Sequence, residues 1–327
     1  MTKASQLYRT AERVVHEGMA VQAGESAVVV TDDGRPAAIA DALMAALRAA
    51  DAEGVLVRMN VQLGRKEPPA PVRAAIASAT VVLAPTTVSL TYSDTLLEAR
   101  GRGARVMTMP LISEPTFVRA GTVVLEELAA TTRAVAARLG RGRRLRLTSR
   151  EGTDLNVELG GHAPEFIDGL CRAPGDYDQV PAGVASVLAI KTEGVIVADA
   201  SASHVGSLGS PLRVEVRDSR IVAVEGGAEA ADLLRWLGAA QDPQVYHCAA
   251  EVGVGTNRWA RHVSSPVFSM EGVRVRGWVH VGFGDNHSLP GGWLTAKLHG
   301  DLLLSKCRLE IDGEALAEDG RLLGDQS

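Results

Sequence analysis

The amino-acid sequence predicts an α/β N-terminal domain with a parallel, Rossmann-like sheet over residues 1–140, and a β-rich antiparallel C-terminal domain over residues 141–327. The chain is long enough for two domains, because its 327 residues are 46% hydrophobic and can fill two cores. Up to about residue 140, short apolar segments alternate with segments of helical periodicity, as in parallel βαβ units. After residue 143, alternating apolar and polar segments follow one another through Gly, Asp and Ser turns, as in antiparallel hairpins.

The elements of the N-terminal half follow from local sequence signals. Pro36 suits the first turn of one helix, and the pair Ser93–Asp94 suits the start of another. We expect strands at 26–33, 54–60, 80–85 and 104–110, and helices at 6–18, 36–50, 69–79, 93–103 and 123–139. The first strand continues into TDDGRPAA, which lacks GxGxxG, and the chain has no Walker A sequence, so NAD or ATP binding is not expected. Tyr92 follows the third strand, where open α/β sheets bind ligands, and is a candidate substrate contact.

The elements of the C-terminal half are mostly strands. We expect them at 143–149, 153–161, 185–190, 194–201 and 212–226, with one helix at 228–241. The last expected hairpin covers residues 308–321, where an Asp-Gly pair marks the turn.

Composition excludes several classes of function. A formal net charge of -5 argues against nucleic-acid binding as the main function of the protein. No apolar run reaches the roughly 18 residues of a membrane span, and the N-terminus lacks the apolar core of a signal peptide. We therefore expect a cytoplasmic protein without a membrane or nucleic-acid partner. Three widely spaced cysteines suggest neither a disulfide framework nor a thiolate zinc site.

Four potential metal ligands gather between residues 247 and 301. In LHGDLLL, His299 and Asp301 stand two apart, so both side chains leave the same face if the run is a strand. His280 lies within the expected strand VHV, where it is either a satisfied core residue or a ligand. Glu251 precedes GVGTN, whose glycines let the backbone approach a ligand closely. These nitrogen and oxygen donors indicate one divalent transition metal ion, Zn, Mn or Fe(II).

A metal-bound water also needs a general base, and three residues are candidates. Glu193 in KTEG is either that base or an exposed turn residue. Asp285 and His287 lie in GFGDNHS, a loop of the kind that concentrates binding residues, although His287 could equally face solvent.

Three motifs in order, AEVGVGTN, VHVGFGDN followed by PGG, and LHGDLLL, resemble the thermophilic-metalloprotease type of aminopeptidase, the aminopeptidase T and S group, and especially its shorter bacterial relatives. That superfamily also includes the iron-dependent 2,5-dihydroxypyridine 5,6-dioxygenase and a nitroanthranilate aminohydrolase. The resemblance implies that Glu251, His280, His299 and Asp301 match the metal-binding positions of the aminopeptidases. It also implies a homodimer.

The sequence departs from both known patterns. The aminopeptidases hold two metals with a further glutamate in a PxGE motif, and the corresponding PAGV places Val184 there, which favours one ion over two. The dioxygenase pattern uses two histidines and an aspartate. Its HxD pair matches His299 and Asp301, but its first histidine falls at Glu251, and a further catalytic histidine matches the region of Thr91 and Tyr92.

The leading functional hypothesis from the sequence is a metal-dependent hydrolase of the aminopeptidase or amidohydrolase type. It would cleave a C–N bond of a small molecule or short peptide through a metal-bound water. The alternative is a mononuclear Fe(II) dioxygenase that cleaves a hydroxylated N-heteroaromatic ring, with His280, His299 and Asp301 as a facial triad. A third hypothesis is a non-catalytic relative that only binds a ligand.

Overall fold

The structure, a computed structural model, describes residues 2–63 and 67–324, and the chain divides into two compact units. The first comprises residues 1–129 and 167–182, and the second comprises residues 130–166 and 183–327. Helix α6 (Leu125–Arg141) spans the first junction, and the boundary expected near residue 140 falls at its end. The segment 167–182 then returns to the first unit, so neither unit is formed from one continuous stretch of chain.

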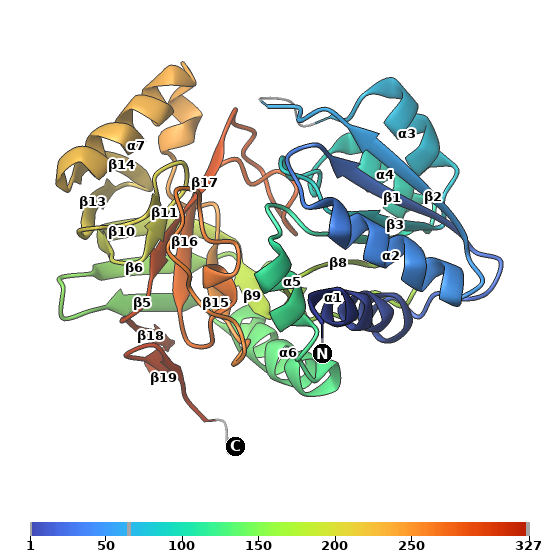
Figure 1. Cartoon of the computed structure of the whole chain (residues 1–327). Coiled ribbons are helices and arrows are strands. Elements are labelled where there is room, and N and C mark those ends of the chain that lie inside the picture. The colour runs from blue at the N-terminus through green and yellow to red at the C-terminus, as the bar shows by residue number, and fades with distance from the viewer. Residues whose placement is uncertain (1, 64–66, 325–327) are drawn as a thin grey trace. The chain divides into compact units, whose positions relative to one another are not determined.

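The first unit contains a five-stranded sheet in the order β2-β1-β3-β4-β8 (Figure 1). Its strands are β1 (Ser26–Asp32), β2 (Glu53–Met59), β3 (Val81–Ala84), β4 (Arg105–Thr108) and β8 (Tyr177–Gln179). Each neighbouring pair is parallel, which confirms the predicted parallel sheet. The last strand, β8, comes from the returning segment and extends the sheet beyond β4.

Helices cover both faces of this sheet because its strands are apolar on both sides. Ala27 and Val29 of β1 share one core with α1 and α2, whereas Val28 and Val30 share a second core with α3 and α4. The helices of this unit are α1 (Lys3–Glu12), α2 (Ala37–Ala49), α3 (Ala70–Ala77), α4 (Asp94–Gly101) and α5 (Glu114–Ala120).

Two helical segments differ from the sequence-based expectation. The helix expected at 6–18 is regular only in α1 and continues as a π-helix over Arg13–Gly18. Helix α5 was not expected. Its start is fixed by Ser113, whose hydroxyl accepts a hydrogen bond from the amide of Thr116 at 3.3 Å.

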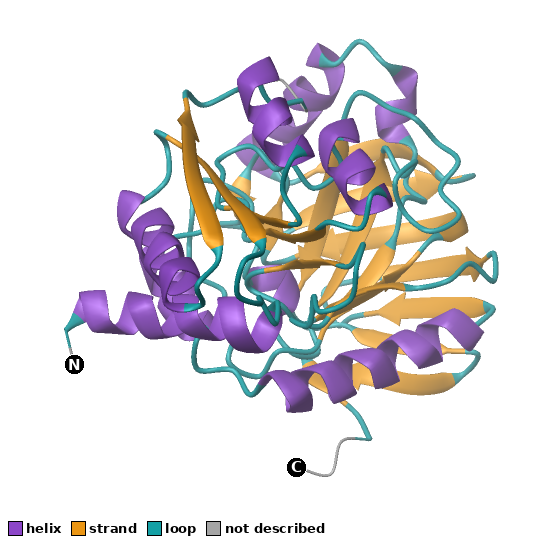
Figure 2. Ribbon diagram, turned by 90° about the vertical axis from the view of Figure 1, so that its right-hand side faces the viewer, coloured by secondary structure: helices purple, strands orange, loops and turns teal. Residues whose placement is uncertain are grey.

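The second unit is built mainly from two antiparallel sheets (Figure 2), which confirms the β-rich C-terminal part of the predicted fold class. The eight-stranded sheet has the order β14-β13-β10-β6-β5-β18-β19-β20, and the seven-stranded sheet has the order β12-β11-β17-β16-β15-β9-β7. The strands of the first are β5 (Arg144–Thr148), β6 (Asp154–Leu159), β10 (Ala189–Ala198), β13 (Leu212–Arg217), β14 (Arg220–Glu225), β18 (Arg308–Ile311), β19 (Glu314–Glu318) and β20 (Arg321–Leu322). Those of the second are β7 (Glu165–Ile167), β9 (Val184–Val187), β11 (Ser201–Ala202), β12 (Gly206–Ser207), β15 (Val252–Gly255), β16 (Val279–Gly284) and β17 (His299–Leu304).

One hydrophobic core joins the two sheets. Leu147 and Val157 of the eight-stranded sheet belong to the same buried cluster as Val281 and Leu302 of the seven-stranded sheet. Helix α7 (Gly227–Ala239) adds Leu233 to this cluster. Because side chains alternate along a strand, the polar residues between these apolar positions lie on the opposite face of the seven-stranded sheet.

Among the helices of the described chain, none combines the length and the apolar character needed to cross a lipid bilayer.

Candidate metal centre

Three adjacent strands, β15, β16 and β17, bring the four expected metal ligands to one face of the seven-stranded sheet. His299 and Asp301 are the first and third residues of β17, and His280 is the second residue of β16. Glu251 directly precedes β15 and accepts a hydrogen bond through its carbonyl from the amide of Gly282 at 2.8 Å. Gly282 is in turn the partner of Asp301, so Glu251, Gly282 and Asp301 form one row across the three strands.

Two glycines make room for this arrangement. A Cβ atom at Gly282 would lie only 2.8 Å from Cγ of Glu251, so the missing side chain lets the carboxylates of Glu251 and Asp301 approach over the strand. Gly253 pairs with His280, and a Cβ there would lie 2.0 Å from Cε1 of that imidazole. The imidazole of His280 therefore occupies the space above β15 that any other residue at position 253 would fill.

The distances within the cluster suit a shared metal ion. Ligand atoms of Glu251, His280 and Asp301 all lie within 4.8 Å of one another. Nε2 of His299 lies 3.4 Å from Oε1 of Glu251 and 3.4 Å from Oδ1 of Asp301. Nε2 of His280 lies 3.8 Å from Oε1 of Glu251. Two donors that bind one ion at normal ligand distances lie about 3.0 to 3.4 Å apart, so these separations approach those of a metal site.

Buried atoms without partners also point to a cation. Among the described residues, Oδ1 of Asp301 and Nδ1 of His280 are buried and take part in no hydrogen bond. Leaving such atoms unsatisfied costs about 1–3 kcal/mol each. For the carboxylate oxygen, a bound cation supplies the missing interaction.

His299 is oriented by a hydrogen bond outside the cluster. Its Nδ1 lies 2.7 Å from the carbonyl oxygen of Asp285, which can only accept, so Nδ1 carries the proton and donates it. Nε2 is therefore the ring nitrogen that faces Glu251 and Asp301. Backbone carbonyls hold metal-binding histidines in this way in many proteins.

The charges of the cluster compensate one another. Burial raises the pKa of Glu251, but hydrogen bonds from His280 and His299, and their charges, outweigh it and hold the pKa well below its usual range. Burial lowers the pKa of His299, but the charge of Asp301, with that of Glu251, raises this pKa well above its usual range. The carboxylate of Glu251 thus keeps its negative charge, which is the state that binds a cation.

Asp285 and His287 lie in the loop after β16, and Asp285 contacts His299 of the cluster. Both carboxylate oxygens of Asp285 lie 2.9 Å from Nδ1 of His287, and its carbonyl holds His299. Ser203, which the sequence analysis did not single out, fixes the other side of β17, because its hydroxyl accepts a hydrogen bond from the amide of Asp301 at 2.9 Å. Ser203 lies in the short turn between β11 and β12, and no local sequence signal marks it.

The remaining candidates lie elsewhere in the fold. Glu193 is exposed on β10 of the eight-stranded sheet, and its carboxylate accepts a hydrogen bond from the amide of Asp218 at 2.7 Å. It therefore fixes a turn of that sheet. Tyr92 is half-buried in the first unit, in the loop between β3 and α4, and its role as a substrate contact stays a prediction.

Val184 occupies a place on the metal-binding face. It is buried at the start of β9 and pairs with Gly255 of β15, in the same alternating series as Gly253 and Glu251. Its side chain is apolar, so position 184 contributes no carboxylate to the cluster.

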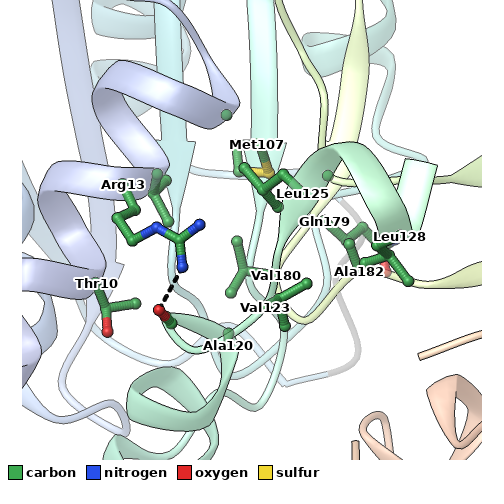
Figure 3. A pocket seen from close by; sticks show the side chains of 14 residues that line it. Thr10, Arg13, Met107, Ala120, Val123, Leu125, Leu128, Gln179, Val180 and Ala182 are labelled. Atoms are coloured by element: carbon green, nitrogen blue, oxygen red, sulfur yellow. Dashed lines mark hydrogen bonds between the residues drawn. The ribbon is translucent and has the colours of Figure 1, made fainter. Parts of the chain in front are cut away.

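A pocket lies in the first unit (Figure 3). Its lining is mostly apolar and includes Met107, Val123, Leu125 and Val180. The guanidinium of Arg13 at its edge donates a hydrogen bond to the carbonyl of Gly121 at 2.6 Å. The pocket holds no cluster of ionisable groups, so its chemistry does not compete with that of the metal centre.

Comparisons with known proteins agree with this description. The model of one family, NicX, 2,5-dihydroxypyridine 5,6-dioxygenase, matches residues 8–324. No curated protein sequence matches the chain. Among solved structures, the 2,5-dihydroxypyridine dioxygenase of Pseudomonas putida KT2440 is similar at a TM-score of 0.84 and 19% identity, over 100% of this chain and 99% of that one. AmpT of Thermus thermophilus is similar at a TM-score of 0.74 and 16% identity, over 98% of this chain and 99% of that one. At these identities the two structures establish the shared fold.

Proposed function

The chain belongs to the 2,5-dihydroxypyridine 5,6-dioxygenase family, and from that premise we propose that it is a mononuclear, metal-dependent dioxygenase that cleaves the ring of a small hydroxylated N-heteroaromatic compound. The observation that carries the proposal is the family match over nearly the whole chain. The cluster of Glu251, His280, His299 and Asp301 supports it. Of the two catalytic functions predicted from the sequence, the family match favours the oxygenase over the hydrolase.

The donor set fits a ferrous ion. His280, His299 and Asp301 supply two imidazoles and one carboxylate, which is the ligand set of the facial triad in many Fe(II) oxygenases. Glu251 adds a second carboxylate, and no cysteine takes part. Because Val184 offers no bridging carboxylate, the same face supports one ion rather than two.

The side chains of the cluster would each have a separate role around the bound ion. Glu251 and Asp301 hold the cation by charge, while the carbonyl of Asp285 keeps Nε2 of His299 directed toward it. The ion, when bound, supplies the one-electron chemistry that lets dioxygen react with an aromatic ring. The ring hydroxyl of the substrate must lose its proton as the ring becomes electron-rich, so a basic side chain is needed near the cluster.

The test is dioxygen consumption. Protein purified without added metal would be analysed for its metal content, then loaded with Fe(II) under argon and mixed with 2,5-dihydroxypyridine in an oxygen-electrode cell. We expect about one ion per chain and uptake of one dioxygen per ring opened, and Asp301→Asn should abolish both ion retention and uptake. If the iron-loaded protein leaves the ring intact at saturating concentrations of the compound and of dioxygen, the proposal fails.

A hydrolase remains the second candidate, and one observation favours it. Glu251 supplies a carboxylate where the dioxygenase pattern described above has a histidine, which makes the ligand set richer in oxygen and suitable for Zn or Mn. The corresponding activity would be release of an amine from a short peptide or an amide under argon, with Zn or Mn bound. Activity without dioxygen would select this candidate.

A further inference from the structure

The loop after β16 carries the side chains of Asp285 and His287. Hydrogen bonds hold the two ends of this loop together. Gly284 turns the chain at a φ of +81°, which favours glycine, and the amide of Asp285 then donates to the carbonyl of Leu298 at 2.8 Å. The side-chain oxygen of Asn286 accepts hydrogen bonds from the amides of Trp293 and Leu294 at 3.0 and 2.7 Å. These hydrogen bonds fix the ends of the loop next to His299, the first residue of β17.

Asp285 orients two imidazoles at once. Its main-chain carbonyl accepts from Nδ1 of His299, as described above, while its carboxylate lies 2.9 Å from Nδ1 of His287. The amide of Ala296 donates to the same carboxylate at 3.1 Å and limits its rotation. Asp285 is buried with 6% of its side chain exposed, whereas 36% of the side chain of His287 is exposed. The carboxylate is thus held inside the fold, and the imidazole that it orients is open to solutes.

Building on the proposed function, we propose that His287 is a catalytic residue that takes the proton of the substrate's ring hydroxyl, and that Asp285 is its positioning residue. A carboxylate that accepts from Nδ1 fixes the tautomer in which Nε2 has a free lone pair. The same carboxylate stabilises the imidazolium that forms when Nε2 takes a proton. The structure provides both conditions at His287.

In this step one proton moves from the ring hydroxyl of the substrate to the imidazole of His287. The O–H bond of the ring hydroxyl breaks and its electron pair stays on the ring oxygen, while an N–H bond forms at Nε2 of His287. The new positive charge lies next to the carboxylate of Asp285, and the proton returns to solvent as the product leaves. Only rings with an ionisable hydroxyl can be substrates for this proton transfer, because a ring whose hydroxyls are all methylated has no proton to give.

The experiment counts protons rather than turnover alone. Metal-loaded protein would be titrated with 2,5-dihydroxypyridine under argon in a calorimeter, in two buffers with different ionisation enthalpies, at about pH 8, above the ordinary pKa of a histidine side chain. In the native protein the substrate's proton stays on His287, so we expect close to no proton released to buffer. With His287→Gln the proton has no local acceptor. We expect release of about one proton per site, or loss of the ionised bound form in the absorption spectrum, and turnover lower by about 10²-fold or more.

Two further variants separate this role from a structural one. Asp285→Asn keeps the carbonyl that holds His299, so it should retain the metal ion but lose turnover and resemble His287→Gln in its proton count. His16→Gln, which replaces an exposed histidine of the first unit, should match the native protein in every measurement. Metal content should be unchanged in all three variants.

The outcomes distinguish this inference from the proposed function. If the native protein consumes dioxygen but His287→Gln matches it in proton count and turnover, His287 is not the acceptor and the proposed function stands. If His287→Gln loses its metal ion, the residue acts on the centre itself and the inference is also wrong. If the native protein neither binds nor oxidises 2,5-dihydroxypyridine, the proposed function fails and takes the inference with it.

Discussion

Replacing Gly253 with alanine tests the geometry of the metal centre with a single methyl group. The new Cβ would lie 2.0 Å from Cε1, 2.5 Å from Nε2 and 2.8 Å from Nδ1 of His280, whereas ordinary contacts begin at 3.4 Å. The imidazole must therefore move by at least about 1.4 Å, the difference between 3.4 and 2.0 Å. A donor shifted this far no longer binds, because ligand distances in metal sites vary by only about 0.2 Å.

We expect two measurable effects of Gly253→Ala. Overpacking a buried contact costs about 1–3 kcal/mol in the free energy of unfolding. Displacing one ligand should weaken metal binding by about 10- to 100-fold, the range seen when ligand orientation is disturbed. Mn²⁺ is a suitable air-stable probe, with affinity measured by calorimetry and stability by denaturant unfolding.

A matched control and a double variant complete this test. Gly238 is exposed on α7 of the same unit, and a Cβ there meets nothing within 4 Å, so Gly238→Ala should leave the Mn²⁺ affinity unchanged and stabilise the fold by about 0.4–1 kcal/mol. In a His280→Ala background, adding Gly253→Ala should weaken Mn²⁺ binding no further, because the clashing ring is gone. Native Mn²⁺ affinity in Gly253→Ala would show that His280 is not a ligand or lies differently.

Three other predictions concern charge. Mn²⁺ at 100 times its Kd should stabilise the native protein by about 2.7 kcal/mol and so raise its melting temperature in thermal unfolding. Asp301→Asn should abolish this rise. An undiminished rise in the variant would exclude Asp301 as a ligand. Glu251→His should still retain a metal ion, since it restores the histidine of the dioxygenase pattern, whereas Glu251→Ala should lose it, and elemental analysis after dialysis would decide. Burial, and then the charge of Asp168, raise the pKa of Asp178 to about 8. The folded state therefore keeps a proton that the unfolded chain has lost, so this group's contribution to stability is present below about pH 4 and disappears as the pH rises through about 8. Asp168→Asn should flatten that decline in denaturant titrations over this range, and an unchanged slope would contradict the coupling.

The sequence was informative about the metal centre where the pattern is local. The spacing of His299 and Asp301 fixed their common face, since side chains alternate along a strand. The approach of Glu251 to Asp301 depends on how three strands align, and on Gly282 lying between them. Alignment between strands is a long-range property, so the sequence could supply the candidates but not their distances.

Features that depend on long-range contacts or on irregular loops were not predicted from the sequence. Strand β8, Tyr177–Gln179, has three residues, which is too short to show a periodicity, and its parallel partner β4 lies far back in the sequence. The pairing of Asp285 with His287 depends on the shape of an irregular loop. Ser203 acts through a single hydrogen bond to the main chain. In contrast, the longer helices and strands were predicted because each repeats its own pattern several times.

The route of the chain has a consequence for biosynthesis. The sheet of the first unit gains its edge strand β8 from residues that follow strands β5 and β6 of the second unit. A ribosome must therefore have produced part of the second unit before the first sheet can be completed. A gene divided at any single codon between α6 and β8 would yield an N-terminal fragment with an open sheet edge at β4, and such an edge is prone to pair with other chains.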